Sequence, residues 1–148
     1  MKNYTVIGTP IKHSISPKIH DYWFKMKKIE ATYNKAELTE NDLENFVKKI
    51  KNKEIDGANV TVPFKEKIIP FLDKLSDEAK EANSVNTIYL SGNDVIGHNT
   101  DIAGFYLSFE KRKKEFQNKN ALLLGSGGVA PSIIIALKRL GIDKIFVS

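Results

Sequence analysis

The sequence predicts an α/β fold in which helices cover both faces of a mostly parallel sheet. Strand-like and helix-like segments alternate from residue 4 to residue 72, and this order is typical of parallel strands joined by helical crossovers. The third strand-like segment, residues 55–62, is apolar with poor alternation, as expected for a parallel strand covered on both sides. With 41% hydrophobic and 28% charged residues, the composition is that of an ordinary globular protein.

Charge and residue usage restrict the class of partner. The formal net charge is +5, but only two of the 23 lysines and arginines are arginines. Because arginine is preferred for the bidentate recognition of phosphates and bases, this balance favours acidic small molecules or solubility over nucleic acid. We expect a small-molecule partner and no nucleic acid. The chain has no cysteine and its three histidines lack the spacing of a chelating pair, so we expect no metal site. No apolar run approaches the roughly 20 residues of a membrane-spanning helix, and we expect a cytoplasmic protein that binds no membrane.

Residues 4–7 form the first predicted strand, and a loop without periodicity follows it up to Ser16. Ser16 and Pro17 indicate a helix start, with the serine as N-cap and the proline in the first helical position. Ser14 and Ser16 are thus a loop serine and a cap, or two hydroxyls that bind a carboxylate beside a helix N-terminus. The helix is predicted to face the core through residues at helical spacing, namely Ile19, Tyr22, Trp23 and Met26.

The second strand is expected over residues 31–38, and the helix after it begins at a capping box formed by Thr39 and Asp42. Lysines on one side of this helix indicate a solvated face rather than a nucleic-acid patch. Its buried stripe is predicted to consist of Leu43, Phe46, Val47 and Ile50.

Three polar side chains lie where the third strand ends: Asn59, Thr61 and Lys65. Ligands of parallel α/β sheets bind at the carboxyl ends of the strands. A lysine in the first turn of a helix loses roughly 0.3 to 1 kcal/mol relative to an anion there, and such a local conflict suggests a functional position. A structural role also stays open for each of them: Asn59 as a residue that ties a loop, Thr61 as a strand former and Lys65 as a solvated cation.

The middle of the chain contains shorter elements. Pro70 interrupts the helix that begins at Phe64, and Ser76 caps another short helix. Residues 88–97 are predicted to form a hairpin that adds antiparallel strands to the sheet. Asn86, just before this hairpin, is a turn residue or a ligand contact.

A further helix is predicted to begin at Thr100, with this residue as its cap and Asp101 as an acid in the first turn. Such an acid is available to face Lys65. The helix ends in a lysine-rich stretch, residues 111–114, and its apolar face is predicted to contain Ile102, Phe105, Tyr106 and Phe109.

Residues 121–124 are predicted to form a buried strand, and residues 125–130 then match the pattern G-x-G-x-x-G/A. The helix that follows ends at Gly141, and a strand is expected over residues 145–147. This context favours dinucleotide binding over a plain tight turn. A complete dinucleotide domain has two βαβαβ halves, so we expect an incomplete Rossmann-type domain and a chain that is a fragment. The residue that would distinguish NAD from NADP follows the second strand of such a domain.

Five motifs together resemble the shikimate dehydrogenase family, and the resemblance covers the whole chain: Ser14-Ile15-Ser16-Pro17, residues 59–65, residues 83–87, Asn99-Thr100-Asp101 and the glycine turn at 125. The chain departs from the family's pattern at Ile102, where many members have glycine, and at residues 129–131, without losing an assigned polar group. The resemblance implies a substrate domain over residues 1–100, a connecting helix and linker over 101–117, and the first βαβ unit of an NADP-binding domain over 118–148.

The resemblance also implies roles for single residues. Lys65 and Asp101 would form the catalytic pair. Ser14 and Ser16 would hold the carboxylate of shikimate, while Thr61, Lys65, Asn86 and Asp101 would surround its hydroxyls. The residues that would bind the cofactor are Asp77, Gly125, Ser126, Gly127, Gly128 and Val129.

The implied reaction is the reversible reduction of 3-dehydroshikimate to shikimate by NADPH, a step in the biosynthesis of chorismate and aromatic amino acids. Two alternatives stay open: a module that binds a shikimate-like ligand or self-associates without turnover, and a dehydrogenase that also uses quinate. An unfinished sheet would leave an open edge near residues 145–148, so we expect a homodimer or other self-association there.

Overall fold

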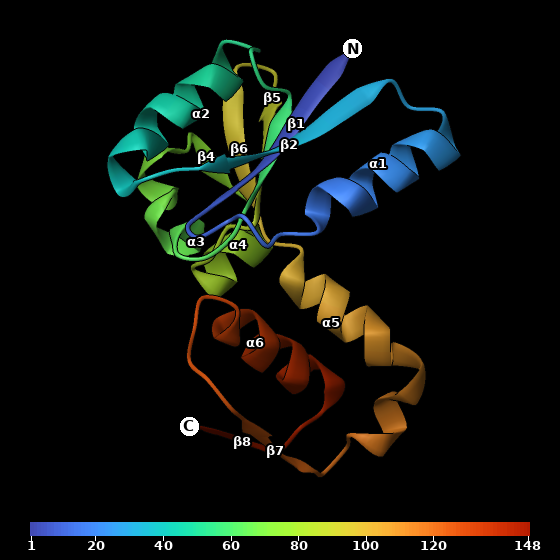
Figure 1. Ribbon diagram of the computed structural model, residues 1–148. Helices are drawn as coiled ribbons and strands as arrows, with labels where there is room; N and C mark the ends of the chain where they lie inside the picture. Colours follow the sequence, from blue (N-terminus) through green and yellow to red (C-terminus); the bar gives the residue numbers. More distant parts are fainter.

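The computed structural model describes residues 1–148, which form a six-stranded sheet and a separate two-stranded sheet (Figure 1). The order of strands in the larger sheet is β2-β1-β3-β5-β6-β4. Its strands are β1 (Lys2–Gly8), β2 (Ala31–Glu37), β3 (Gly57–Val60), β4 (Lys74–Leu75), β5 (Thr87–Ser91) and β6 (Asp94–His98).

Strand direction explains how distant motifs reach one edge of this sheet. β1 pairs in parallel with β2 and β3, β4 pairs in parallel with β6, and β5 is antiparallel to both of its neighbours. All strands except β5 therefore run the same way, which confirms the predicted mostly parallel sheet. The carboxyl ends of β1, β3 and β6 and the amino end of β5 consequently lie at one edge.

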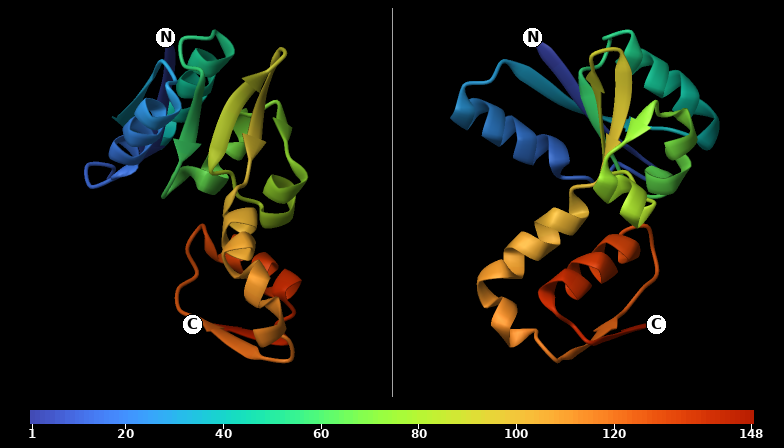
Figure 2. Two further views of the ribbon diagram at one scale, coloured as in Figure 1. Left: turned by 90° about the vertical axis from the view of Figure 1, so that its right-hand side faces the viewer. Right: turned by 180° about the vertical axis from the view of Figure 1, so that it is seen from behind.

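Helices cover both faces of the sheet, as expected (Figures 1 and 2). The helix α2 packs into a core of 13 buried residues that includes Ile7, Val60 and Ile88, while α1 lies on the opposite face against Tyr4 and Tyr33. The predicted capping box before α2 is present, and so is its buried stripe. The helices of this part are α1 (Ser16–Lys27), α2 (Leu43–Lys51), α3 (Phe64–Lys67) and α4 (Asp77–Ala82), with 3-10 turns at Glu40–Asp42 and Ile69–Phe71.

The predicted core face of α1 is wrong. No residue of this helix is buried, and the side chains of Tyr22, Trp23 and Met26 are 64%, 49% and 54% exposed. The helix contacts the sheet through a neighbouring stripe instead, where His20 stacks on Tyr33 at 4.0 Å between ring centroids. Because α1 leans on β1 and β2 near the edge of the sheet, only one narrow side of the helix is covered.

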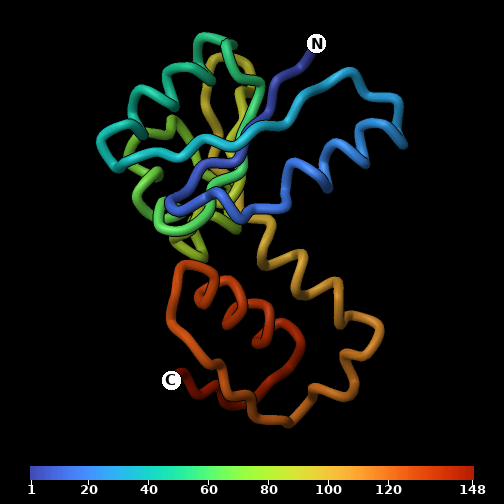
Figure 3. Tube along the Cα trace, viewed as in Figure 1, coloured from blue at the N-terminus to red at the C-terminus, as the bar shows by residue number.

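The chain leaves the larger sheet after β6 and forms a smaller unit (Figure 3). Its two strands are parallel, and its helices α5 and α6 pack together around Ile102 and Ala136. Gly141 ends α6 with a φ of 94°, as predicted. The elements are α5 (Asp101–Phe109), a 3-10 helix (Glu110–Glu115), β7 (Asn120–Leu123), α6 (Ala130–Leu140) and β8 (Lys144–Val147).

The prediction that residues 121–124 form a buried strand is only half right. The strand exists, but Leu122 is 65% exposed and Leu124, just beyond it, is 76% exposed. A sheet of two strands has few neighbours to cover its outer surface. No helix of the chain is long and apolar enough to cross a membrane.

Candidate functional site

Four of the five sequence motifs meet at the sheet edge described above. Residues 61–65 follow β3, residues 99–101 follow β6, Asn86 precedes β5, and the loop that carries Ser14 and Ser16 follows β1. The backbone joins them directly. The N–H of Thr61 donates to the carbonyl of Ile7 at 2.9 Å, and the N–H of Asn86 donates to the carbonyl of His98 at 3.0 Å.

Gly8 allows the loop with the two serines to pass close to β3. A Cβ atom at this position would lie 2.6 Å from Thr61 Cγ2 and 3.0 Å from the carbonyl oxygen of Val62. The backbone N–H of Thr9 donates to that same carbonyl at 3.1 Å. The glycine therefore sets how closely the start of this loop approaches Thr61 and Val62.

Lys65 and Asp101 form an ion pair at the centre of the site. The Lys65 Nζ atom lies 2.6 Å from Asp101 Oδ2, and the two side chains are 12% and 22% exposed. The carbonyl of Lys65 also accepts from the N–H of Val85 at 2.8 Å, which holds the segment before Asn86 against α3. A charge-assisted bond this short and sheltered fixes both groups.

Asn86 orients the carboxylate of this pair. Its Nδ2 donates to Asp101 Oδ1 at 2.9 Å and to Thr100 Oγ1 at 2.8 Å. Its Oδ1 accepts from the N–H of Thr100 and from Thr87 Oγ1, each at 3.0 Å. Thr100 occupies the N-cap position of α5 and Asp101 its first turn, as predicted, but the Thr100 hydroxyl makes no capping bond. Asn99 Oδ1 accepts from the N–H groups of Asp101 and Ile102 instead.

Asn59 has the structural role that the sequence left open. Its Nδ2 donates to the carbonyl of Asn86 at 3.3 Å and to Thr87 Oγ1 at 3.2 Å. Its Oδ1 accepts from the hydroxyl of Tyr33 at 2.6 Å. These three bonds join β2, β3 and β5, and one of them holds the backbone carbonyl of Asn86 in place.

The two serines contact each other at the start of α1. Ser14 Oγ donates to Ser16 Oγ at 3.1 Å and accepts from the N–H of Ser16 at 3.3 Å. The predicted N-cap is therefore wrong, since Ile15 occupies the cap position of α1 and no side chain caps it. The N–H that this local turn satisfies is that of Ser16, the first residue of α1.

The glycine turn lies against Lys65. A Cβ atom at Gly128 would be 3.8 Å from two carbons of the Lys65 side chain, and the carbonyl of Gly128 accepts from Ser84 Oγ at 3.0 Å. Gly125 has a φ of 104°, a conformation that favours glycine, and a Cβ atom at Gly125 or Gly127 would meet nothing within 4 Å. A cavity of about 250 Å³ lies between the two parts, lined by Val62, Pro63, Lys65, Glu66, Lys67, Gly127 and Gly128.

Not every predicted residue joins this cluster. Asp77 stands at the start of α4 with its side chain 99% exposed, and its carboxylate lies 3.4 Å from Lys80. Ser126 is exposed, and Val129, at the N-cap position of α6, is 44% exposed. Asp77 makes no hydrogen bond to the ion pair or to the glycine turn.

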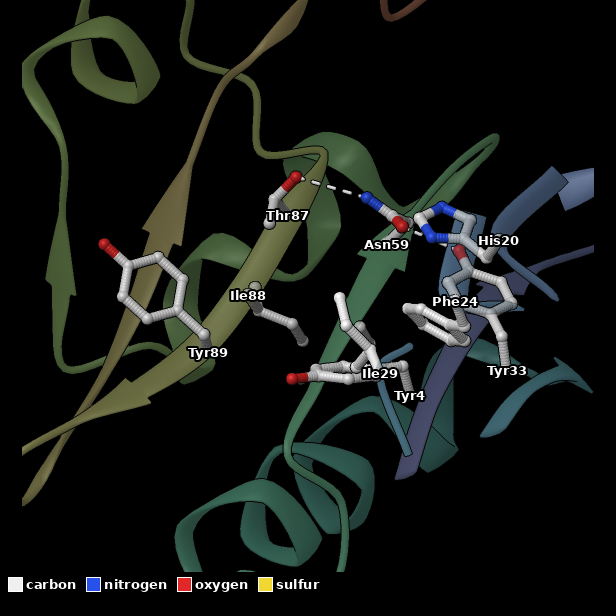
Figure 4. Close-up of a pocket in the computed structure, with 11 residues that line it drawn as sticks. Tyr4, His20, Phe24, Ile29, Tyr33, Asn59, Thr87, Ile88 and Tyr89 are labelled. Carbon is white, nitrogen blue, oxygen red and sulfur yellow. Dashed lines mark hydrogen bonds between the residues drawn. The ribbon is translucent and has the colours of Figure 1, made fainter. Parts of the chain in front are cut away.

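A second cavity, of about 280 Å³, lies beside α1, and the sequence reasoning missed it (Figure 4). Tyr4 of β1 is paired with Tyr33 of β2 in the sheet. Two aromatic residues at paired positions of adjacent strands are the sequence feature that could have indicated this cavity. Burial raises the pKa of Tyr33 to about 12, and burial lowers the pKa of His20, opposed by the charge of Asp21. Asn59 and Thr87, bonded to each other, form the polar end of this cavity.

Comparison with known proteins gives a consistent result. The family model described as "Shikimate dehydrogenase substrate binding domain" matches residues 6–88. A shikimate dehydrogenase (NADP(+)) from Pelagibacter ubique is 56% identical over 147 residues, which are 99% of this chain and 56% of the relative. The chain thus spans about half the length of that relative.

Two solved structures share the fold. Shikimate dehydrogenase 1 from Peptoclostridium difficile superposes with a TM-score of 0.91 at 37% identity, over 99% of this chain and 56% of that one. A shikimate 5-dehydrogenase from Thermus thermophilus, solved in complex with NADP(H) and shikimate, gives a TM-score of 0.89 at 28% identity over the same shares. These matches support the predicted α/β architecture over nearly the whole chain.

Proposed function

We propose that this chain, which belongs to the shikimate dehydrogenase family, supplies the substrate-binding part of a cytoplasmic, NADP-dependent oxidoreductase that interconverts 3-dehydroshikimate and shikimate. The observation that carries the proposal is the Lys65–Asp101 ion pair, which lies against a glycine turn. A proton donor held beside a dinucleotide-binding turn is what a carbonyl reduction requires.

Lys65 protonates the ketone oxygen of 3-dehydroshikimate as it becomes an alkoxide, and in the reverse direction it accepts the proton of the hydroxyl. Asp101 keeps the ammonium group in place through its Oδ2 atom, while Asn86 holds the other carboxylate oxygen. Because neither charge is more than 22% exposed, the proton is transferred in a setting with little competing water.

The remaining polar groups of the edge bind the substrate. Ser14 and Ser16 donate to its carboxylate, because their hydroxyls are adjacent where the loop after β1 meets the start of α1. Thr61 and Asn86 contact the ring hydroxyls together with the ion pair. The close approach that Gly8 permits supports this assignment, since it brings the start of the loop that leads to the serines against Thr61.

The glycine turn fits the pyrophosphate of NADP. Gly125 and Gly127 leave their surroundings free of side chains, and α6, a helix of 11 residues, begins directly after the turn, so its N–H groups favour an anion. Bound NADPH supplies the hydride that reduces the ketone. Ser126, Gly128 and Val129 would complete the turn that holds the cofactor, and Asp77, at the start of α4, would lie near the nicotinamide.

The same proposal divides the chain into the three regions expected from the sequence. Residues 1–100 form the substrate domain, residues 101–117 the connection, and residues 118–148 the start of the cofactor domain. The 13-residue core supports the first boundary, because all its members lie between Ile7 and Val95.

A direct test measures NADPH oxidation with 3-dehydroshikimate. The 148-residue chain is compared with a chimera that continues into the rest of the Pelagibacter ubique relative, beyond the matched region. We expect turnover by the chimera, and shikimate binding by both proteins in calorimetry. A chimera that neither binds shikimate nor oxidises NADPH would disprove the proposal.

The same assay separates the alternatives. If the chain alone binds shikimate without turnover while the chimera is active, the short chain is a ligand-binding module. Turnover by the chain alone would exclude that alternative. Quinate, offered with NADP, shows whether the substrate range is broader.

We further propose self-association through the smaller sheet. Both strands have an unpaired edge, and Leu122, Phe146 and Val147 are between 46% and 65% exposed, which favours strand addition. Light scattering at increasing concentration should show a dimer. Phe146→Lys should shift the measured mass towards that of the monomer. A wild-type chain that stays monomeric at high concentration would contradict the proposed self-association.

A further inference from the structure

Asn99 is a buried polar residue to which the proposed mechanism gives no task. It follows β6 directly, its exposed fraction is 0%, and its carboxamide makes four hydrogen bonds. We propose that Asn99 is a positioning residue that holds Asp101 and the cofactor-side helix α6 in a fixed relation. The inference rests on the proposed function for its effect on catalysis, and on the contacts alone for its structural part.

The oxygen of the carboxamide faces α5. Asn99 Oδ1 accepts from the N–H of Asp101 at 2.9 Å and from the N–H of Ile102 at 3.2 Å. These are two of the N–H groups that a helix start leaves unpaired. Asn99 therefore fixes the first turn of α5, and with it the backbone from which Asp101 reaches Lys65.

The nitrogen of the same carboxamide faces the cofactor side. Asn99 Nδ2 donates to Ser132 Oγ and to the carbonyl of Ser84, each at 2.9 Å. Ser132 lies in the first turn of α6 and is 0% exposed. Ser84 is also buried, and its hydroxyl donates to the carbonyl of Gly128 in the glycine turn.

One planar group thus links the two halves of the site. A displacement of α6 moves Ser132, and the carboxamide transmits that displacement to the N–H of Asp101. Asparagine suits the position because it offers an acceptor and two donors at once. An aspartate would keep the acceptor but would set a buried charge against the Ser84 carbonyl without a donor. Because reacting groups must be aligned closely, a displacement of about 1 Å costs up to about 100-fold in rate.

Amide hydrogen exchange in the 148-residue chain tests the structural part without any ligand. Ser132→Ala removes one partner of Asn99 Nδ2, and alanine is the better helix former, so α6 itself should not weaken. We expect exchange at the N–H groups of Asp101 and Ile102 to become about tenfold faster, with amides in the middle of α6 unchanged. Ser108→Ala, on the exposed side of α5, is the control and should change neither. Rates within twofold of wild type at Asp101 and Ile102 would overturn the inference.

Steady-state kinetics of the chimera test the catalytic part. Ser132→Ala should lower kcat about tenfold and leave the KM for 3-dehydroshikimate within twofold, because only Asp101, of the groups that bind the substrate, is displaced, while the two serines and Thr61 stay in place. Ser132→Thr, which keeps the hydroxyl, should recover part of kcat. A fall in melting temperature with unchanged kcat would show a purely structural contact and refute the positioning role. If the wild-type chimera neither binds shikimate nor oxidises NADPH, the proposed function fails, while the exchange rates still decide the role of Asn99.

Discussion

At the scale of single residues, the site depends on a lysine that one carboxylate holds in place. Lys65 lies in α3, a helix of only four residues whose last turn also contains Lys65, so the helix dipole does not distinguish the two helix ends at this position. Asp101 holds the ammonium group at 2.6 Å in a sheltered position. The conflict that the sequence suggests at Lys65 is therefore weak in the structure, and the ion pair carries the assignment instead.

Replacing Lys65 with alanine should remove the proton donor of the proposed reaction. We expect kcat of the chimera to fall about 100-fold to 10,000-fold, the range for loss of a general acid. Lys48→Ala is the matched control, because Lys48 is an exposed lysine on α2 paired only with Glu44. Steady-state NADPH oxidation measures both variants, and an unchanged kcat in Lys65→Ala would refute the catalytic assignment.

Tyr33 should make stability depend on alkaline pH. Burial raises its pKa to about 12 in the folded chain, against about 10 for an unfolded tyrosine. The neutral phenol therefore contributes stability that is fully present below pH 10 and is lost as the pH rises towards 12. Tyr33→Phe should lose less stability than wild type between these values, as measured by urea unfolding. Tyr22→Phe, at an exposed position of α1, should behave like wild type, and equal pH profiles for all three proteins would contradict the prediction.

At the scale of elements, the geometry of the site depends more on how closely neighbouring segments approach each other than on which secondary structure they adopt. Gly8→Ala would place a Cβ atom 2.6 Å from Thr61 Cγ2, which is closer than packed carbons tolerate. We expect a loss of about 1 to 3 kcal/mol in the free energy of unfolding and weaker shikimate binding, because the serine loop must move. Gly104→Ala, with nothing within 4 Å on α5, should instead stabilise the chain by about 0.5 to 1 kcal/mol. Urea unfolding gives both values, and a Gly8→Ala variant as stable as wild type would contradict the close approach.

The elements also show what the sequence could predict. The stripe of α2 was correct because all four of its apolar residues face one continuous core. The stripe of α1 was wrong because that helix has a sheet on one narrow side only, and apolar spacing carries no information on whether a partner is present. For the same reason Leu122 was expected to be buried and is not.

The sequence could predict which residues form the site, but not which hydrogen bonds connect them. Lys65, Asp101 and Asn86 were identified from motifs, and they form one hydrogen-bonded group. Asn99 and Ser132 are 33 positions apart, and their contact depends on how α6 returns to the sheet edge. Sequence patterns describe local structure, so long-range partners of this kind were missed.

At the scale of the whole molecule, the two parts differ in how much core supports them. The larger sheet has a core of 13 buried residues, while the cluster between α4, α5 and α6 contains three. The smaller part is held to the larger one by the three-residue cluster that includes Ala82 of α4, by an ion pair between Arg139 and Glu81, by buried polar bonds around Asn99 and by the contact of the glycine turn with Lys65. Its position near the catalytic pair therefore depends on few interactions.

This difference predicts unequal local stability. Amides of β7 and β8 should exchange at least about tenfold faster than those of β1 and β3, because local opening costs less where few apolar contacts are lost. The hairpin β5–β6 is the matched control: it too consists of two adjacent strands, but Ile88 and Val95 are 0% exposed within the larger core. Hydrogen exchange followed by mass spectrometry resolves these segments, and we expect β5 and β6 to be protected like β1. Equal protection of β7 and β1 would mean that the two parts open as one cooperative unit, and the few contacts across the boundary would then have to be as strong as the core itself.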